Sequence, residues 1–182
     1  MLRIVAGKHR GRKLTPLEGG NVRPTAGRAR EAIFNILAHA AFAPRPVYED
    51  AIVLDAFAGS GALGLEALSR GAAACTFVES DRGACRTINA NLDKLGLEAI
   101  VLCQDVLRAL ARERGTFDLV LCDPPYGFDG HDRLAPQLVR VLAPDGLLVY
   151  ESSGRAEPPD VPGLAARTSR KYGSARLTLF TR

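Results

Sequence analysis

The sequence predicts an α/β fold in which a mostly parallel sheet carries helices on both faces. Between about residue 50 and residue 150, apolar runs of strand length alternate with amphipathic stretches of helix length. This alternation is typical of parallel sheets with crossover helices. Four of the predicted strands end in, or lead to, the acidic residues Asp55, Glu79, Asp105 and Asp123. Right-handed crossovers place the strand-to-helix loops at one edge of such a sheet, so these acids are expected to line that edge.

Local patterns along the chain define the elements. Apolar residues at positions 2, 4 and 14, interleaved with glycines, predict a small hairpin at the beginning of the chain, and a one-sided apolar stripe predicts a helix over about 26–40. The strands and helices that follow are predicted, in order, at 52–55, 61–70, 74–79, 82–95, 99–103, 106–113, 117–122, 132–142 and 147–151. Gly71 and Gly96 mark two helix ends, because glycine adopts the left-handed conformation that ends many helices.

The last part of the chain predicts the edge of the sheet. Asp145-Gly146 predicts a turn before the strand at 147–151. Two further strands, 165–171 and 176–180, are joined by residues 172–175 and read as a hairpin. This hairpin would give the sheet one antiparallel edge strand.

The tetrapeptide Asp123-Pro124-Pro125-Tyr126 follows the apolar strand at 117–122. Each proline fixes its own φ and restricts the residue before it, so the chain leaves the sheet as a stiff loop. The loop presents a carboxylate, backbone carbonyls and an aromatic ring. These groups can stack on a flat base and accept hydrogen bonds from an exocyclic NH2 group. A proline-rich turn followed by a core tyrosine is an equal alternative from these four residues alone.

A glycine loop follows the strand at 52–55. Residues 59–64 form a G-x-G-x-x-G sequence, which is typical of a strand-to-helix turn that binds a nucleotide cofactor. Asp55 precedes it and suits a ligand with a cationic amino-acid end better than a pyrophosphate. Glu79 lies 24 residues beyond Asp55, about where an acid meets ribose hydroxyls in such folds. Gln104-Asp105, after the strand at 99–103, are placed to bind the edge of an adenine.

The basic residues are concentrated at the beginning of the chain. The net charge is +4, yet the first 30 residues hold eight basic residues and a single acid, Glu18. The eight are Arg3, Lys8, Arg10, Arg12, Lys13, Arg23, Arg28 and Arg30. Displayed on a hairpin beside a base-binding loop, they indicate a nucleic-acid partner. A solvated arm without a partner is the alternative.

Together these motifs resemble a known enzyme family. The D-x-x-x-G-x-G sequence at 55–61, the acids at 79 and 105 and the D-P-P-Y tetrapeptide resemble class I S-adenosylmethionine-dependent methyltransferases, in the branch that methylates exocyclic amines of nucleobases. The segments 3–14, 22–37, 65–72, 77–81 and 172–180 are similar to the bacterial 16S rRNA guanine-N2 methyltransferases, so the resemblance covers nearly the whole chain apart from the loop at 43–50.

The resemblance implies a Rossmann-like, seven-stranded sheet and a set of site residues. The expected catalytic residues are Asp123, Pro124, Pro125 and Tyr126. S-adenosylmethionine is the expected cofactor, held by Asp55, Phe57, Ala58, Gly59, Ser60, Gly61, Glu79, Ser80, Gln104, Asp105 and Asp123. The expected RNA contacts are Lys8, Arg10, Arg12, Lys13, Arg23, Thr25, Arg28 and Arg30. No metal is expected, because the four cysteines have no metal-ligand spacing.

The resemblance also implies the activity. Residues 1–40 would form a basic RNA-binding extension and residues 41–182 the catalytic domain, acting as a cytoplasmic monomer on N2 of a guanine in 16S rRNA within the 30S subunit. Adenine-N6 methylation of RNA or DNA remains an alternative, because D-P-P-Y suits either amine. An NAD-binding oxidoreductase would explain the glycine loop and Glu79 but leaves Asp55, Asp105 and D-P-P-Y without a role. No apolar run is long enough to predict a membrane span.

Overall fold

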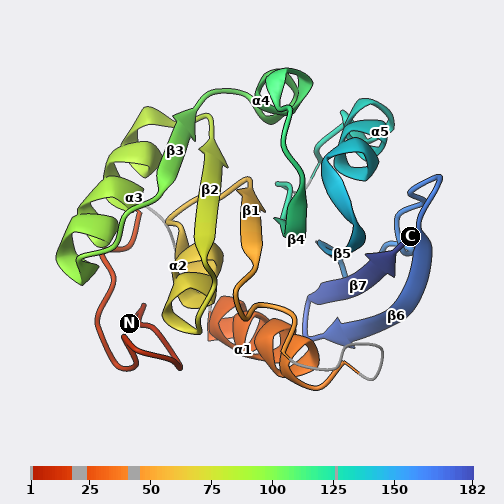
Figure 1. Cartoon of the computed structure of the whole chain (residues 1–182). Helices are drawn as coiled ribbons and strands as arrows, with labels where there is room; N and C mark the ends of the chain where they lie inside the picture. Colours follow the sequence, from red (N-terminus) through yellow and green to blue (C-terminus); the bar gives the residue numbers. More distant parts are fainter. Residues whose placement is uncertain (1, 18–23, 41–45, 126) are drawn as a thin grey trace.

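The computed structural model describes residues 2–17, 24–40, 46–125 and 127–182, with side chains at all of them except 24–26 and 28. The predicted alternation of strands and helices is confirmed (Figure 1). The elements are α1 (Pro24–Ala38), β1 (Ile52–Ala56), α2 (Ala62–Ser69), β2 (Ala74–Glu79), α3 (Arg82–Leu95), β3 (Ile100–Cys103), α4 (Val106–Arg112), β4 (Phe117–Cys122), α5 (His131–Val141), β5 (Leu142–Ser153), β6 (Ala165–Tyr172) and β7 (Ala175–Thr181). In the described part of the chain, no helix has the length and hydropathy of a membrane span.

The seven strands form one sheet in the order β3-β2-β1-β4-β5-β7-β6. Strands β1 to β5 are mutually parallel, and β7 runs antiparallel to both of its neighbours, β5 and β6. The hairpin of β6 and β7 therefore makes the antiparallel edge that the sequence predicted, with β7 inserted next to β5. Strand β1 pairs with β2 on one side and with β4 on the other, so the order reverses between β1 and β4. Ligands of open α/β sheets bind at this kind of switch point, beyond the carboxyl ends of the strands.

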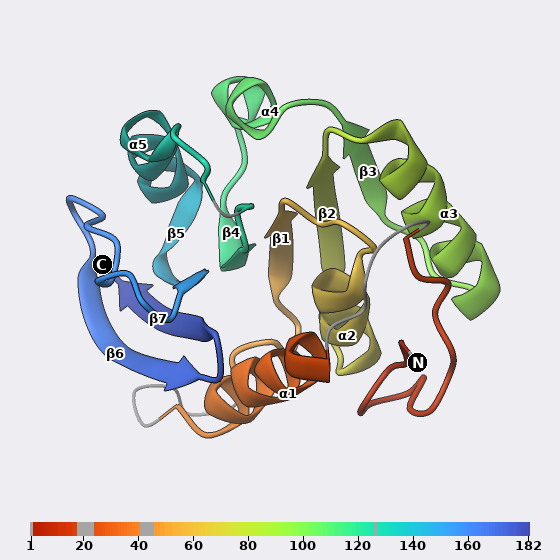
Figure 2. The same cartoon turned by 180° about the vertical axis from the view of Figure 1, so that it is seen from behind.

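Two hydrophobic cores cover the two faces of the sheet. Along β1, Val53 packs with α1, α2 and α3, whereas Leu54 packs with α4 and α5. This follows from the alternation of side chains along a strand. Figure 2 shows the sheet and the helices on its two faces from behind. Because helices cover both faces of the sheet, the ends of the strands are the part of the sheet that stays open.

Strand β5 differs from its prediction. It begins at Leu142 instead of residue 147, and the predicted Asp145-Gly146 turn lies inside it as a bulge between the pairs Phe117–Leu142 and Leu119–Leu147. Gly146 fits this bulge because an added Cβ would lie 3.0 Å from the Phe117 carbonyl oxygen. The turn residues therefore kink a continuous strand.

The amino-terminal hairpin is docked against the sheet domain. Arg3 and Lys13 form an antiparallel bridge, as the hairpin prediction requires. Ile4 and Leu14 are 1% and 4% exposed and join the core that contains α1, α2 and α3. The hairpin is thus an integral part of this core.

Candidate functional site

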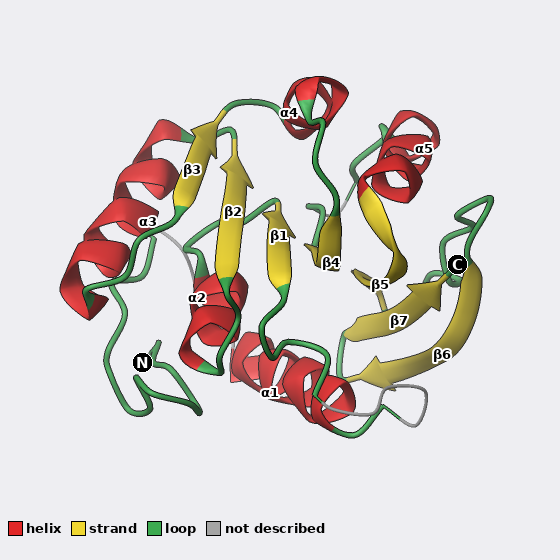
Figure 3. Ribbon diagram, viewed as in Figure 1, coloured by secondary structure: helices red, strands yellow, loops and turns green. Residues whose placement is uncertain are grey.

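The carboxyl ends of β1, β2, β3 and β4 lie along one edge of the sheet, and the loops that follow them carry the predicted site residues. In Figure 3 the arrows of β1, β2 and β3 end at the same side of the sheet. Parallel pairing places Asp55, near the end of β1, beside Phe77 of β2 and Leu121 of β4. The four predicted acids, Asp55, Glu79, Asp105 and Asp123, therefore line one edge, as expected.

Glu79 fixes the glycine loop between β1 and α2. Its Oε2 accepts a hydrogen bond from the Gly59 N–H at 2.8 Å, and its Oε1 accepts from the Asp81 N–H at 2.8 Å. Gly59 has a φ of +55° and faces open space, since an added Cβ would meet only a Leu17 atom, at 4.0 Å. The loop thus presents bare backbone at the edge of the sheet. A carboxylate has about four acceptor positions, so Glu79 can also accept from ribose hydroxyls.

The other predicted loop residues hold this conformation. The Ala58 N–H donates to the Val78 carbonyl at 2.9 Å, and the Ser60 carbonyl accepts from Asn91 Nδ2 at 3.4 Å. Gly61 has a φ of +77°. A side chain there would be strained and would lie 3.2 Å from Ile88, so this glycine is required by the turn itself.

Asp55 lies beneath the glycine loop. It is 1% exposed, and its Oδ2 accepts from the Gly64 N–H at 2.8 Å. Burial raises its pKa to about 7, and the charges of Asp123 and Glu79 add to the rise. Gly64 itself packs on β2, where an added Cβ would lie 2.4 Å from the Phe77 ring. In this structure Asp55 anchors the start of α2, so it acts on the loop through Gly64.

The third strand supplies the polar residues after β3. Gln104 is half-buried and Asp105 is exposed. One oxygen of Asp105 accepts from the Arg108 N–H at 3.1 Å and caps α4, which leaves the second oxygen available to an adenine amine. Ser80, also exposed, donates to Glu79 Oε1 at 3.5 Å.

The loop after β4 carries the catalytic candidates. The Asp123 N–H approaches the Ala56 carbonyl at 3.5 Å, and Phe128 N–H donates to the Pro125 carbonyl at 3.0 Å. The rings of Phe57 and Phe128 meet edge to face with centroids 5.1 Å apart, which joins the loops after β1 and β4. Asp123 is open to solvent on one side, yet enough protein surrounds its carboxyl group for desolvation to raise its pKa to about 6. The predicted stacking residue, Tyr126, lies outside the described residues.

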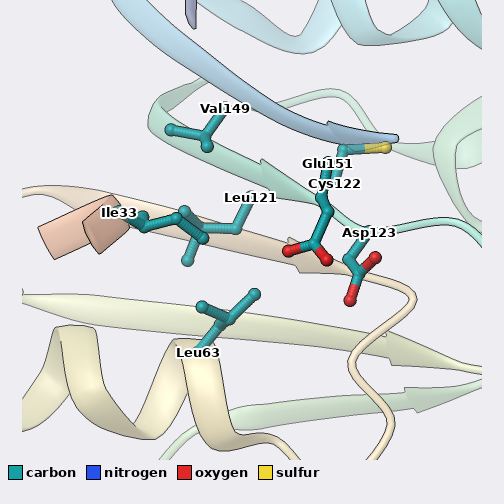
Figure 4. Close-up of a pocket in the computed structure, with 7 residues that line it drawn as sticks. All are labelled: Ile33, Leu63, Leu121, Cys122, Asp123, Val149 and Glu151. Atoms are coloured by element: carbon teal, nitrogen blue, oxygen red, sulfur yellow. The ribbon is translucent and has the colours of Figure 1, made fainter. Parts of the chain in front are cut away.

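A fifth acid, Glu151 of β5, belongs to this edge and was missed by the sequence analysis. It lines a pocket together with Asp123 (Figure 4). Burial raises its pKa to about 8, and the charge of Asp123 contributes to this rise. Its position near the end of the strand after D-P-P-Y is the signal that could have identified it. Among the described residues, no group of His, Cys, Asp and Glu has the arrangement of a metal site.

The basic hairpin is held by a buried glutamate that was also missed. Glu66 of α2 is 0% exposed, and its two carboxyl oxygens accept from the Val5 and Ala6 N–H groups at 2.8 and 2.9 Å. Arg70 Nε pairs with Glu66 at 2.7 Å, and Arg30 Nε lies 3.9 Å from it. Through its hydrogen bonds to Val5 and Ala6, Glu66 therefore fastens the hairpin to α2.

Ser69 and Asn91 complete this attachment. The Lys8 N–H donates to the Ser69 carbonyl at 2.7 Å, and Ser69 Oγ donates to the Ala6 carbonyl at 2.7 Å. Asn91 of α3 accepts from the Thr15 N–H at 2.7 Å and also reaches the Ser60 carbonyl of the glycine loop. The hairpin and the glycine loop thus share a side chain.

The predicted RNA contacts divide into two groups. Lys8, Arg10, Arg12 and Lys13 are exposed, and Arg12 Nη2 donates to the Lys94 carbonyl at 2.8 Å. Arg30 is different, because it is 7% exposed and its Nη2 donates to the Arg3 carbonyl at 2.7 Å beside Glu66. Its burial leaves it no surface for a phosphate, so we do not carry Arg30 into the RNA-binding set. Arg23 and the side chains of Thr25 and Arg28 lie outside the described residues.

Comparison with known proteins gives concordant matches. The family model described as Conserved hypothetical protein 95 matches residues 2–181. The Ribosomal RNA small subunit methyltransferase D of Escherichia coli K12 is 40% identical over 152 residues, which are 83% of this chain and 71% of that protein. The Putative rRNA methyltransferase YlbH of Bacillus subtilis is 34% identical over 187 residues, 98% of each chain.

Solved structures share the architecture. The putative methyltransferase YhhF from Escherichia coli matches with a TM-score of 0.86 and 34% identity over 100% of this chain and 97% of that chain. The 16S rRNA N2 G1207 methyltransferase of Thermus thermophilus, solved with AdoMet and guanosine, matches with a TM-score of 0.70 and 22% identity over 90% of this chain and 44% of that one. The latter match shows a common fold. These matches confirm the class I methyltransferase fold predicted from the sequence.

Proposed function

This chain belongs to the Ribosomal RNA small subunit methyltransferase D family, and from this premise we propose that it methylates the exocyclic N2 of a guanine in 16S rRNA. It is a methyltransferase that uses S-adenosylmethionine, as the resemblance implied. The family prediction made from the sequence motifs is therefore confirmed. The identity of the methylated atom, and the residues that act on it, are our proposals.

The observation that carries the proposal is the junction between two loops at the switch point. The glycine loop after β1 and the D-P-P segment after β4 leave adjacent parallel strands, and Phe57 contacts Phe128 across them. A cofactor held by the first loop would therefore place its reactive end beside Asp123. Holding two reactants in contact can supply several kcal/mol of the barrier to a displacement reaction.

The residues present fit the cofactor. Gly59 offers bare backbone facing open space, which a side chain would fill. Glu79 and Asp105 offer carboxylate oxygens for ribose hydroxyls and an adenine amine, and Glu79 already holds the loop through the Gly59 N–H. When bound, the cofactor supplies a methyl group on a positively charged sulfur. The acids along this edge, with Asp55 beneath the loop, suit such a cation.

Asp123 would orient the accepting amine. The lone pair of guanine N2 is delocalised into the ring, so the free amine is a weak nucleophile. Hydrogen bonds from N2–H to the Asp123 carboxylate and the Pro124 carbonyl favour a pyramidal nitrogen whose lone pair faces the methyl group. Pro125 stiffens this loop, and Tyr126 would stack on the base, a contact worth about 1–3 kcal/mol. The base must leave its stack, or come from a loop that is already open.

The exposed basic residues would bind the RNA backbone. Lys8, Arg10, Arg12 and Lys13 lie on a hairpin fastened to α2, the helix that begins at the glycine loop. Phosphate contacts position a protein on its nucleic acid without reading sequence. We propose that residues 1–40 deliver this charge, with Arg23, Thr25 and Arg28 as further contacts. We also propose that a monomer acts on the 30S subunit in the bacterial cytoplasm, where rRNA is modified.

The experiment is base-resolved mapping of methyl transfer. Small-subunit rRNA from a strain that lacks the gene would be incubated with the chain and tritiated S-adenosylmethionine, both as free 16S rRNA and as 30S particles. Nuclease digestion and mass spectrometry would then identify the nucleoside. We expect N2-methylguanosine at one position, formed far more slowly by an Asp123→Ala variant. N6-methyladenosine would support the alternative in which adenine N6 is methylated. The absence of label from 16S rRNA, both free and in 30S particles, would refute the proposal.

A further inference from the structure

Glu151 stands directly beside the catalytic candidate Asp123. The last parallel pair of β4 and β5 is Cys122 with Tyr150. Asp123 and Glu151 are the next residues of the two strands, and neighbouring strands lie about 4.8 Å apart. Leu121 and Val149 pack with α1 and α2, and side chains alternate along a strand, so Asp123 and Glu151 both face that side. Figure 4 shows the two carboxyl groups next to each other.

The surroundings of the two carboxyl groups are apolar. The pocket is lined by Ile33 of α1, Leu63 of α2 and the strand residues Leu121, Cys122 and Val149. On the other neighbouring strand, β7, Glu151 pairs with Leu177. Among the described residues that line this pocket there is no basic side chain. The described lining therefore offers these carboxyl groups no cationic partner, which leaves their oxygens available to a ligand.

The titration of the pair is asymmetric. Desolvation raises the pKa of Asp123 to about 6 and that of Glu151 to about 8, and the Asp123 charge adds to the rise at Glu151. Asp55 of β1, which pairs with Leu121, also faces this side of the sheet, and burial raises its pKa to about 7. Two neighbouring carboxylates repel each other, so we expect the pair to hold one proton near pH 7, and we assign this proton to Glu151 because the charge of Asp123 adds to the rise of its pKa. Pairs of acids whose environments separate their pKa values in this way have different roles.

We propose that Glu151 is a base-specificity residue, whose neutral carboxyl group pairs with the N1–H and O6 of the target guanine while Asp123 holds N2. This inference rests on the proposed function and deepens it. A neutral carboxyl group has one acceptor oxygen and one O–H donor side by side. The N1–H and O6 groups of guanine form the matching pair, and N2 follows next to N1 on the same edge. Guanine thus satisfies both residues at once.

Adenine would satisfy fewer of these groups. With its N6 amine at Asp123, adenine offers the N1 acceptor and then the C2–H, so one Glu151 oxygen would lack a partner. A site built to hydrogen-bond a substrate rejects an analogue that leaves buried polar groups unpaired. Glu151 would therefore help to select guanine over adenine at a loop that suits either amine.

The test compares Glu151→Gln with Glu151→Leu. An amide has an acceptor and a donor in the same arrangement as a neutral carboxyl group, so Gln preserves the pairing, whereas Leu removes both groups. Methyl transfer to rRNA from a strain lacking the gene would be measured as kcat/KM between pH 5.5 and 9.5. We expect Glu151→Leu to lower kcat/KM roughly 10- to 100-fold. The kcat/KM of Glu151→Gln should stay within about threefold of the wild-type value at pH 7.

The pH profiles distinguish recognition from a structural role. Wild-type activity should rise as Asp123 ionises and fall as Glu151 ionises, giving a maximum near pH 7. The Glu151→Gln profile should rise in the same way and then stay level to pH 9. S-adenosylhomocysteine affinity and melting temperature should be unchanged in both variants. Glu157→Gln, at an exposed glutamate outside the pocket, is the matched control and should keep the wild-type maximum.

Each outcome decides the inference. Wild-type kcat/KM in the Leu variant would overturn it, and so would a Gln variant that loses as much activity as Leu or keeps the alkaline fall. If the Leu variant does not fold, the Gln profile alone carries the test. A wild-type chain that transfers no methyl group to rRNA would instead refute the proposed function, and the inference with it.

Discussion

Two acidic sites in this molecule differ in what surrounds their carboxyl groups. Glu66, on α2, accepts from two backbone N–H groups of the hairpin and pairs with Arg70, and Arg30 lies beside it. Asp123 and Glu151, at the ends of β4 and β5, sit in a pocket whose other described side chains are uncharged. Among the described residues, Glu66 therefore has basic and backbone partners from the chain, whereas the pocket of Asp123 and Glu151 has no basic side chain.

The difference separates structural acids from ligand-binding acids. A buried charge must be paired, or its protonation shifts. Glu66 is paired by the chain itself and stabilises the contact between hairpin and helix. The pKa values of Asp123 and Glu151 rise because the surrounding protein desolvates both carboxyl groups, and the charge of Asp123 adds to the rise at Glu151. We infer that the guanine supplies their hydrogen-bonding partners. Four predictions test this contrast.

The largest effect is expected at Asp123, on the rate of methyl transfer. Asp123→Ala removes the acceptor that orients the amine, so kcat should fall roughly 10²–10³-fold while S-adenosylhomocysteine binding changes little. Single-turnover methyl transfer and calorimetry measure the two quantities. An active Asp123→Ala enzyme would show that this acid is no more functional than Glu66.

Substitution of Glu66 should lower the stability of the protein. Glu66→Ala leaves Arg70 and Arg30 buried without their partner and frees the Val5 and Ala6 N–H groups, so the free energy of unfolding should fall by about 3–5 kcal/mol. Urea denaturation of the wild type and the variant measures this loss. The control is Glu98→Ala, at an exposed glutamate, which should change stability by less than about 0.5 kcal/mol. Equal stabilities for the two variants would contradict a structural role for Glu66.

The sequence predicted the fold and the acids along the ligand edge, because both follow from local patterns. Strand-length apolar runs, helix periodicity and connection rules determine where each strand ends. Asp55, Glu79, Asp105 and Asp123 are all recognisable as residues that end or follow a strand. Even so, no local pattern indicates that Asp55 is buried under the loop, because its partner is a backbone N–H on the next helix.

Long-range partners account for what the sequence did not reveal. The hairpin groups that bind Glu66 lie 60 and 61 residues away in the chain, so no local spacing connects them. Arg30 was interpreted as a surface cation for the same reason, since its burial depends on Glu66 and on the carbonyl of Arg3. Glu151 lies in a predicted strand with no motif around it. Its position beside Asp123 depends on how β4 and β5 pair, and this register cannot be read from the sequence.

The exposed charges of the hairpin provide the third prediction. Lys8, Arg10 and Lys13, each changed to Gln, should each reduce the salt dependence of rRNA binding by somewhat under one unit, because each lost phosphate contact releases fewer counterions. Deletion of the hairpin would be a poorer experiment, since it would also remove Ile4 and Leu14 from the core.

The measurement is filter binding to 16S rRNA over a salt series, with methyl transfer as a second readout. Arg112→Gln, Arg114→Gln and Lys171→Gln form the control set, because these exposed residues lie away from the hairpin. We expect an unchanged slope in the control set. The same slope in both sets would show that the hairpin charges only solvate the surface.

The last prediction concerns the pH dependence of stability at Asp55. This acid has a pKa near 4 in an unfolded chain, whereas burial raises it to about 7 in the folded protein. Between these values the folded state holds a proton that the unfolded state has lost, so the free energy of unfolding decreases as the pH rises. Asp55→Asn cannot titrate, and its Oδ1 can still accept from the Gly64 N–H. The variant should therefore lose less stability than the wild type between pH 5 and pH 8, as measured by urea denaturation at each pH. Asp132→Asn, at an exposed aspartate of α5, should follow the wild type. If Asp55→Asn keeps the full wild-type slope, Asp55 is compensated by the chain as Glu66 is, and the contrast would apply to Asp123 and Glu151 alone.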